Sequence, residues 1–182
     1  MQFLYEIFNL VVSFLGSLLL LRAYLWALAV GPRDPVVSFT WRFTDWLVNP
    51  VSYLVRPRGN WDWPSLLASL LVAVVGTLVT REVTGFPVTP AAFAVAPFAL
   101  VLRWGINFLI WMVLLYALVS FFGPRMMGYQ SLLGMLTDPF LRPIRRVLPR
   151  WRNFDFSPVV LFIVLSLILR WITPLSMGVL FF

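Results

Sequence analysis

Four long apolar stretches constrain this chain more than any other feature. They run over residues 7–30, 66–79, 98–122 and 159–172. A helix needs about 20 mainly apolar residues to cross a bilayer, and the shorter second stretch is extended by Pro64, Ser65 and Thr80. Hydrophobic residues make up 61% of the chain and charged residues only 12%, whereas soluble domains have roughly 45–50% and 25%. The sequence therefore predicts an all-α membrane protein with four transmembrane helices.

The arginines predict how these helices are oriented. All 14 basic residues are arginine, and ten of them lie in the two long connections, 31–65 and 123–158, whereas the connection 81–90 holds only Arg81. Basic residues concentrate in cytoplasmic loops. We therefore expect a multi-pass membrane protein whose two long connections face the cytoplasm and whose termini are both outside. The net charge of +7 suits anionic lipid at that face, and no nucleic acid is expected. The first stretch is expected to be a retained span, because no basic residue precedes it as in a signal peptide.

The two long connections resemble each other at a constant offset of 93 residues. Each resembling block lies between two apolar stretches, so two copies would enter the membrane in the same direction, as in a parallel repeat. We predict two helical hairpins, with a degenerate first unit at 1–80, an extracytoplasmic linker at 81–90 and a second unit at 91–182. The matched residues of the repeat motif are Thr44, Asp45, Pro50 and Asp62 in the first copy, and Thr137, Asp138, Pro143 and Asp155 in the second.

Several of these residues are typical of helix starts. Ser157 is a good N-cap, Pro158 suits the first helical position, and Asp155 places negative charge near the positive end of a helix. Asp62 with Pro64 has the same character in the first copy. Thr137-Asp138-Pro139 also reads as a helix start. We interpret the aspartates as structural residues where the chain enters a helix.

The segment after Pro139 predicts an amphipathic helix that lies in the membrane interface, with Pro143 dividing it into two short pieces. Its counterpart, 39–55, has aromatic side chains in place of a basic face, as is typical of interfaces. We expect the basic face to contact anionic lipid or a partner protein. The apolar face consists of Phe140, Ile144, Val147 and Leu148, the basic face of Arg142, Arg145 and Arg146, and the aromatic residues of the first copy are Trp41, Trp46 and Tyr53.

Three arginines, Arg22, Arg103 and Arg170, fall within the apolar stretches. An arginine at the centre of a span costs about 2.5–3.5 kcal/mol on insertion scales. These side chains either form a polar path or extend to the interface. Arg22 lies deepest, and the candidate partners within the spans are Asn9, Asn107 or a carbonyl group.

The chain lacks both cysteine and histidine. This removes thiolate nucleophiles, the commonest metal ligand and the usual general base. No acid lies within the spans beyond Glu6 near the outer end of the first, which disfavours a proton relay. We expect no enzyme activity, no metal and no cofactor.

The run from Gln130 to Pro149, with Thr-Asp-Pro-Phe-Leu-Arg-Pro-Ile-Arg-Arg at its centre, is followed by Phe154-Asp-Phe-Ser-Pro158. It resembles the YggT family of bacterial and plastid membrane proteins, which often carry two copies of one unit. The resemblance implies a location in the bacterial cytoplasmic (inner) membrane, and roles in cell division, envelope organisation or the assembly of membrane complexes. Family members tend to carry an arginine late in the span before the motif. Arg22 fits that place, but the second copy has Leu115 there, beside Tyr116.

Three classes of function follow from these observations. The first is a scaffold or assembly factor of the cell envelope that acts through anionic lipid, a membrane-protein partner or self-association. The second is ion or osmolyte transport, which would need a polar cavity at membrane depth. The third is an accessory subunit of a larger membrane complex.

Overall fold

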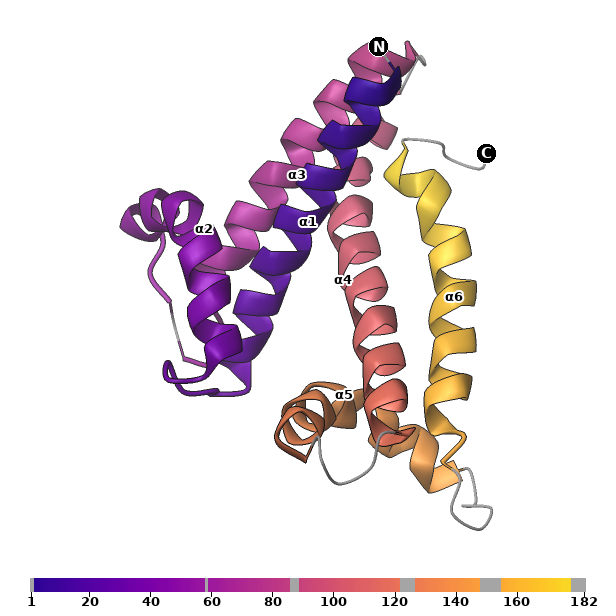
Figure 1. Ribbon diagram of the computed structural model, residues 1–182. Coiled ribbons are helices and arrows are strands. Elements are labelled where there is room, and N and C mark those ends of the chain that lie inside the picture. The colour runs from indigo at the N-terminus through magenta and orange to yellow at the C-terminus, as the bar shows by residue number, and fades with distance from the viewer. Residues whose placement is uncertain (1, 58, 86–88, 122–126, 148–154, 178–182) are drawn as a thin grey trace. The chain divides into compact units, whose positions relative to one another are not determined.

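A computed structural model describes residues 2–57, 59–85, 89–121, 127–147 and 155–177. Within these ranges the chain forms six helices and no strand (Figure 1). Four of them are long and apolar enough to cross a membrane: α1 (Gln2–Ala27), α3 (Trp63–Thr84), α4 (Pro90–Phe121) and α6 (Ser157–Ser176). Helices α3 and α6 contain the predicted stretches 66–79 and 159–172, and α1 and α4 cover most of 7–30 and 98–122. The prediction of an all-helical chain with four candidate spans is therefore confirmed for the described residues.

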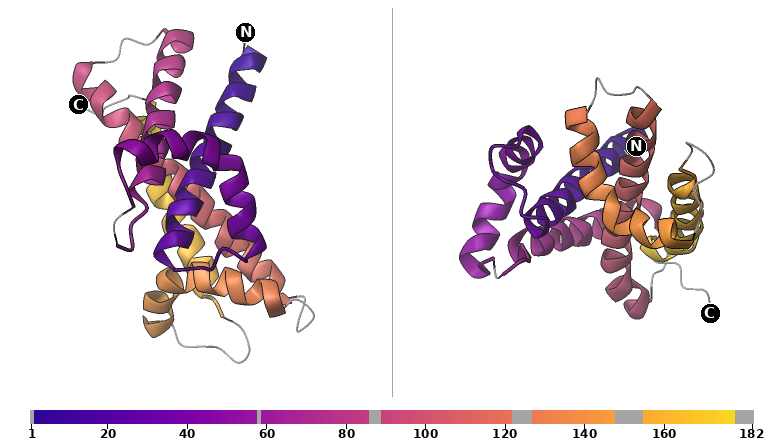
Figure 2. Two further views of the ribbon diagram at one scale, coloured as in Figure 1. Left: turned by 90° about the vertical axis from the view of Figure 1, so that its left-hand side faces the viewer. Right: turned by 90° about the horizontal axis from the view of Figure 1, so that it is seen from below.

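Two further helices occupy the long connections: α2 (Pro35–Leu54) between α1 and α3, and α5 (Met127–Val147) between α4 and α6. The prediction that Pro143 divides the second of these was wrong, because α5 continues through Pro139 and Pro143. A proline removes one backbone hydrogen bond and can bend a helix without ending it. Helix α2 likewise continues through Pro50, and both helices change direction along their length (Figure 2).

The predicted helix start at Thr137-Asp138-Pro139 was also wrong, since these residues lie well inside α5. In α2 the start is set by Asp34, whose carboxylate accepts a hydrogen bond of 2.8 Å from the amide of Val36. Pro35 then occupies the first turn, where its missing N–H costs nothing. The paired motif threonines and first aspartates are therefore mid-helix residues.

The described chain separates into two compact units whose boundaries fall inside α4 and α6. The first contains α1, α2, α3, the start of α4 to Gly105 and the end of α6 from Ile172. Its helices α1, α2 and α3 pack against one another (Figure 1). Their common core is formed by Leu19, Val48, Val51 and Ala68.

Helix α3 buries several small residues, among them Ser69, Ala73 and Gly76, and Ala73 packs in a cluster with Val12 of α1. Small residues let two membrane helices approach closely. A β-carbon on Gly76 would lie 3.1 Å from Cγ1 of Val12 on α1. Close packing therefore holds α1 and α3 together in the first unit.

Helix α4 joins this unit through Trp104, whose ring lies against Gly16 of α1. The side chain of Trp104 is buried, and it packs in a cluster with Val12 and Ala73. A β-carbon on Gly16 would collide with the indole ring. The close approach requires glycine at this position.

The second unit contains α4 from Ile106, α5, and α6 to Trp171. Leu136, Thr137 and Leu141 of α5 are almost fully buried, as is Val113 of α4. Leu161 and Leu165 on α6 are also buried. These compact units reflect contacts within the chain, so the division into repeat units at 81–90 stays a prediction. Residues 86–88 of that linker lie outside the described chain.

Candidate functional site

An arginine of α1 joins two aspartates of the first long connection, one within α2 and one at the start of α3. Nη1 of Arg22 donates to Oδ1 of Asp45 at 2.6 Å and to Oγ1 of Thr44 at 2.9 Å. Its Nε lies 3.6 Å from Oδ2 of Asp62 and makes no hydrogen bond with any described residue. The guanidinium also lies over the ring of Trp41, 5.5 Å from its centroid. We call these residues the first clamp.

Asp62 has a second role as the N-cap of α3. Its Oδ1 accepts from the amide of Ser65, and its Oδ2 accepts from the Ser65 hydroxyl at 2.5 Å. Only 5% of the Asp62 side chain is exposed, against 12% for Arg22 and 44% for Asp45. A buried charge must be paired or hydrogen-bonded. The first clamp therefore connects α1, α2 and the start of α3 through a largely buried ion pair.

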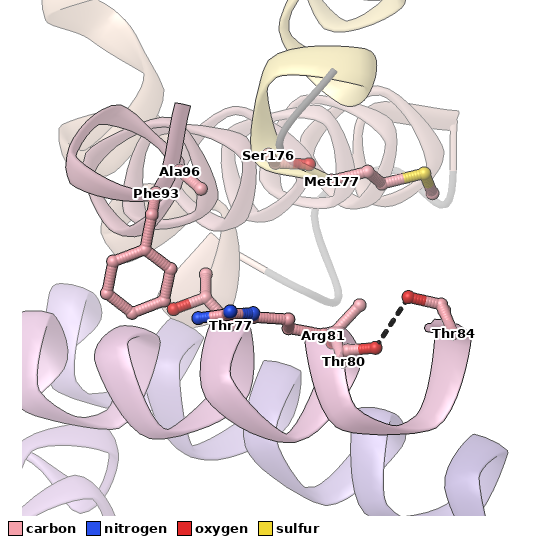
Figure 3. Close-up of a pocket in the computed structure, with 8 residues that line it drawn as sticks. All are labelled: Thr77, Thr80, Arg81, Thr84, Phe93, Ala96, Ser176 and Met177. Carbon is pink, nitrogen blue, oxygen red and sulfur yellow. Dashed lines mark hydrogen bonds between the residues drawn. The ribbon is translucent and has the colours of Figure 1, made fainter. Parts of the chain in front are cut away.

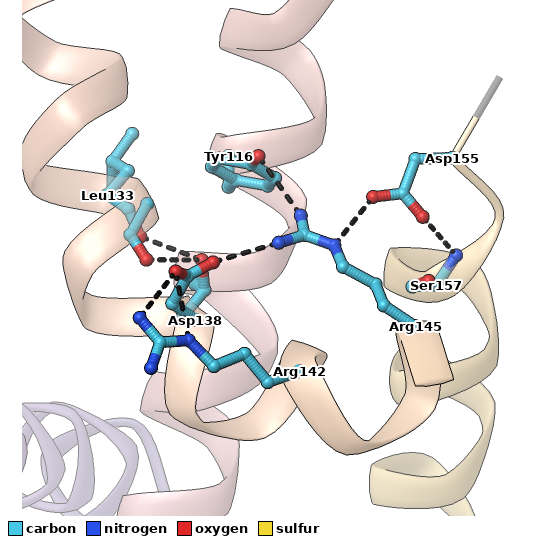
Figure 4. Close-up of polar contacts among 9 residues, drawn as sticks. Tyr116, Leu133, Asp138, Arg142, Arg145, Asp155 and Ser157 are labelled. Atoms are coloured by element: carbon cyan, nitrogen blue, oxygen red, sulfur yellow. Dashed lines mark hydrogen bonds and ion pairs between the residues drawn. The ribbon is translucent and has the colours of Figure 1, made fainter. Parts of the chain in front are cut away.

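The motif aspartates of the second unit are joined in the same way (Figure 4). Arg145 of α5 donates from Nη1 to Oδ1 of Asp138 and from Nε to Oδ2 of Asp155, both at 2.8 Å. Its Nη2 donates to the hydroxyl of Tyr116 on α4 at 3.2 Å. We call Arg145, Asp138, Asp155 and Tyr116 the second clamp. It connects α4, α5 and the start of α6.

The second clamp shifts the pKa of two of its members. Burial lowers the pKa of Arg145, but hydrogen bonds with Tyr116 and Asp155 outweigh it, so the pKa stands above its usual value. Burial raises the pKa of Asp155, but hydrogen bonds from Ser157 and Arg145 outweigh it and hold this pKa below its usual value. Both shifts favour the charged forms. The second clamp is therefore a stable ion pair at neutral pH.

The second-copy helix start differs from the prediction in which residue caps it. Ser157 is the first residue of α6, and Oδ1 of Asp155 accepts a hydrogen bond of 3.0 Å from its amide. The cap is thus the aspartate rather than the serine, and Pro158 occupies the second helical position. Asp62 and Asp155 both act at the start of the following span.

The structure divides the predicted basic face of α5. Arg145 is held inward by the second clamp, with 19% of its side chain exposed, whereas Arg142 is 71% exposed and contacts Asp138 at 3.3 Å. Arg146 is exposed as well. Phe140 and Val147, from the predicted apolar face, are exposed at 40% and 82%, and Leu148 lies outside the described residues. Two guanidiniums, not three, remain open to a ligand.

The three arginines of the apolar stretches have different surroundings. The partners of Arg22 are Thr44, Asp45 and Asp62, which the sequence analysis did not identify. Arg103 donates to the Ser176 hydroxyl at 3.1 Å, and Arg170 is exposed. In the second copy, Leu115 occupies the position that corresponds to Arg22, and the neighbouring Tyr116 is the residue of this helix that contacts Arg145.

A small pocket lies between α3, the start of α4 and the end of α6 (Figure 3). The centre of a water molecule could occupy about 20 Å³ of this pocket, so the pocket has room for little more than one water. Its threonine hydroxyls already donate to carbonyl groups of their own helix, and Arg81 lies 5.8 Å from the ring centroid of Phe93. The hydroxyls offer acceptors suited to a cation, which Arg81 would repel. The described residues also contain no group of three acidic, histidine or cysteine side chains that could hold a metal.

The comparisons with known proteins agree with the repeated geometry. The family model described as CCB3/YggT matches the chain in two segments, residues 1–82 and 95–176. The chain belongs to the CCB3/YggT family. Each matched segment contains one clamp, so the resemblance noted in the sequence is confirmed, including its tandem arrangement.

Two relatives illustrate the similarity of this YggT-family chain to bacterial proteins. It is 27% identical over 158 residues to a protein named YggT from Escherichia coli (strain K12), covering 87% of this chain and 82% of the relative. It is 31% identical over 159 residues to a protein of Haemophilus influenzae, covering 86% and 84%. Neither relative's name states an activity. No solved structure matches the chain.

Proposed function

We propose that this protein is a membrane scaffold that organises the cell envelope by binding anionic lipid headgroups at its cytoplasmic face. In this proposal the chain forms two parallel hairpin units, α1–α3 and α4–α6, in the bacterial inner membrane. Helices α2 and α5 lie flat in the interface as amphipathic segments, and both termini are outside. The constant offset of 93, the two family segments and the arginine distribution support this arrangement.

The observation that carries the proposal is the division of the arginines on α5. Arg145 is withdrawn into the second clamp, while Arg142 and Arg146 are exposed beside the exposed Phe140 and Val147. At about 100° per residue, Arg142 and Arg146 are close neighbours on one side of the helix, and Phe140 and Val147 lie on the opposite side. Such a helix places its apolar side in the acyl region and its guanidiniums at headgroup phosphates. The second clamp fixes this rotation.

The alternative functions have less support among the described residues. A transport path would need polar groups that line a cavity, but Arg22 and Arg103 are engaged with side chains of their own unit, and the pocket beside Arg81 holds little more than one water. An accessory subunit would use the same interfacial surface for a protein. We further propose that the protein acts without catalysis, since the sequence offers neither cysteine nor histidine.

Thermal unfolding in nanodiscs tests the proposal. Adding anionic phosphatidylglycerol to phosphatidylcholine should raise the melting temperature of the wild type, because ligands that bind the native state stabilise it. Each arginine near the surface contributes about 1 kcal/mol, and salt screens it. The variant Arg142→Gln/Arg146→Gln should lose this gain.

The matched control is Arg81→Gln/Arg170→Gln, which removes the same charge away from α5. It should keep the stabilisation by anionic lipid. Equal stabilisation of the wild type and the α5 variant would contradict the proposal and favour a protein partner for this surface.

A further inference from the structure

The two clamps hold equivalent aspartates with arginines that come from different helices. Asp45 and Asp62 correspond at the offset of 93 to Asp138 and Asp155. The first pair is joined by Arg22 of α1 and the second by Arg145 of α5. Neither arginine has a counterpart, because the offset pairs Arg22 with Leu115 and Arg145 with Ser52. The arginine that bridges the two aspartates is thus on the preceding span, α1, in the first unit and on the connecting helix, α5, in the second.

The aromatic ring that supports each guanidinium has moved in the opposite direction. Arg22 of α1 lies 5.5 Å from the ring centroid of Trp41, which is on α2. Arg145 of α5 lies 5.9 Å from the ring centroid of Tyr116, which is on α4. In the first unit the span supplies the charge and the connecting helix supplies the ring. In the second unit these contributions are exchanged.

Where one unit has the aromatic ring, the equivalent position of the other unit has a small residue. The offset pairs Trp41 with Gly134 and Tyr116 with Ala23. A β-carbon on Gly134 would lie 3.6 Å from Cε2 of Tyr116, so a tryptophan there would meet the tyrosine ring. Ala23 is buried, with 8% of its surface exposed, so a larger side chain at this position would have to displace its neighbours. At all four pairs of positions, the residues therefore differ as expected if the arginine and the aromatic ring have exchanged helices between the two units.

We propose that the first and second clamps are reciprocal forms of one latch, and that the helix supplying the arginine is interchangeable. The latch requires one guanidinium between two carboxylates, backed by one aromatic ring on the facing helix. Its aspartates come from the connecting helix and from the start of the next span. One arginine therefore ties the connecting helix to that span, whichever helix carries it. The geometry assigns Tyr116 as the positioning residue of Arg145, in the role that Trp41 has for Arg22.

Relocation of the arginine within the second unit tests this inference. Arg145→Ser should lower the melting temperature in detergent without anionic lipid, a condition that separates the latch from lipid binding. The relocated variant, Leu115→Arg/Tyr116→Ala/Gly134→Trp/Arg145→Ser, gives this unit the residues of the first clamp. It should recover at least half of the lost melting temperature. The matched control carries Leu115→Gln in place of Leu115→Arg and should recover none.

A second measurement shows whether the relocated guanidinium reaches the aspartates. Asp155→Asn should be added both to the relocated variant and to Arg145→Ser. It should lower the melting temperature more in the relocated variant, because only that variant has a guanidinium in contact with Asp155. The reverse exchange in the first unit, Arg22→Leu/Ala23→Tyr/Trp41→Gly/Ser52→Arg, covers the case in which the second unit does not accept the tryptophan. It should melt above Arg22→Leu alone. The inference is overturned if neither relocated variant recovers stability, or if recovery does not depend on the aspartate.

Discussion

The guanidinium of Arg22 and the carboxylate of Asp62 form a buried ion pair between helix α1 and the N-cap of α3, with Nε 3.6 Å from Oδ2. The same carboxylate caps α3 through Ser65. Desolvation offsets much of the attraction in a buried pair, so its net contribution to stability is small. Removing one partner is a different matter, because the other charge is then buried without compensation. The pair therefore acts as a constraint on how α1, α2 and α3 fit together.

Replacing Arg22 should test this constraint. Arg22→Gln leaves the negative charge of Asp62 in a site that is almost closed to solvent, and removing one member of a buried pair costs about 3–5 kcal/mol. Thermal unfolding in detergent should show a marked loss for this variant. Adding Asp62→Asn should restore part of the loss, because the asparagine is neutral and can still accept a hydrogen bond from Ser65. A double variant that is less stable than Arg22→Gln would show that the two side chains are not coupled as described.

Gly16 should tolerate no side chain. A β-carbon there collides with the ring of Trp104, and overpacking of this kind costs about 1–3 kcal/mol. Gly16→Ala should lower the melting temperature even though alanine favours the helix. Gly31→Ala is the control, because no atom lies within 4 Å of a β-carbon at that position. Equal melting temperatures for the two variants would contradict the packing of α4 on α1.

The sequence was sufficient to predict the helical class, the four spans and the repeated aspartates, because each depends on local pattern. The length and hydropathy of a span are set by the lipid that surrounds it. The constant offset of the repeat can be seen in the sequence without knowing how the helices pack. Proline was misleading at Pro143, since the bend at a proline can be absorbed within one helix. The predicted role of Asp62 as a residue at a helix start is confirmed, because capping is decided within a few residues.

The clamps could not be predicted from the sequence because they depend on which side chains tertiary packing brings together. The sequence predicted that Arg145 belongs to a basic face, since helical periodicity places it near Arg142 and Arg146. Only the approach of Tyr116 and Asp155 turns it inward. The sequence indicated a buried charge at Arg22, and the candidate partners were groups within the spans. Its actual partners lie on α2 and before α3.

The second clamp should weaken in acid. The pKa of Asp155 is lower in the folded protein than in the unfolded chain, so its stabilisation is complete above the unfolded value of about 4 and is lost as the pH falls through the folded value. About a third of the side chain is exposed, so solvent screening keeps the effect modest. Between pH 6 and pH 3 the melting temperature should fall more for the wild type than for Asp155→Asn. Parallel curves for the two proteins would exclude a contribution from this pair.

Cysteine labelling should show the orientation of the spans. The chain has no native cysteine, so a single introduced thiol reports one position. In intact bacteria, a membrane-impermeant thiol reagent should label Thr84→Cys, near the sparsely charged connection, and should leave Gly31→Cys and Met127→Cys unlabelled until the cells are opened. Labelling of either long connection from outside would reverse the predicted topology.

The position of α5 in the membrane is the most direct test of the proposed function, because the binding of lipid headgroups by Arg142 and Arg146 depends on it. Nitroxide spin labels at Phe140→Cys, Val147→Cys, Arg142→Cys and Arg146→Cys can be compared by power saturation in anionic vesicles. We predict that the labels at 140 and 147 are relaxed mainly by oxygen, which concentrates in the acyl region, and those at 142 and 146 mainly by a water-soluble nickel chelate. If all four labels are equally accessible to the nickel chelate, α5 lies in water rather than in the interface, which would contradict the binding of lipid headgroups by this helix.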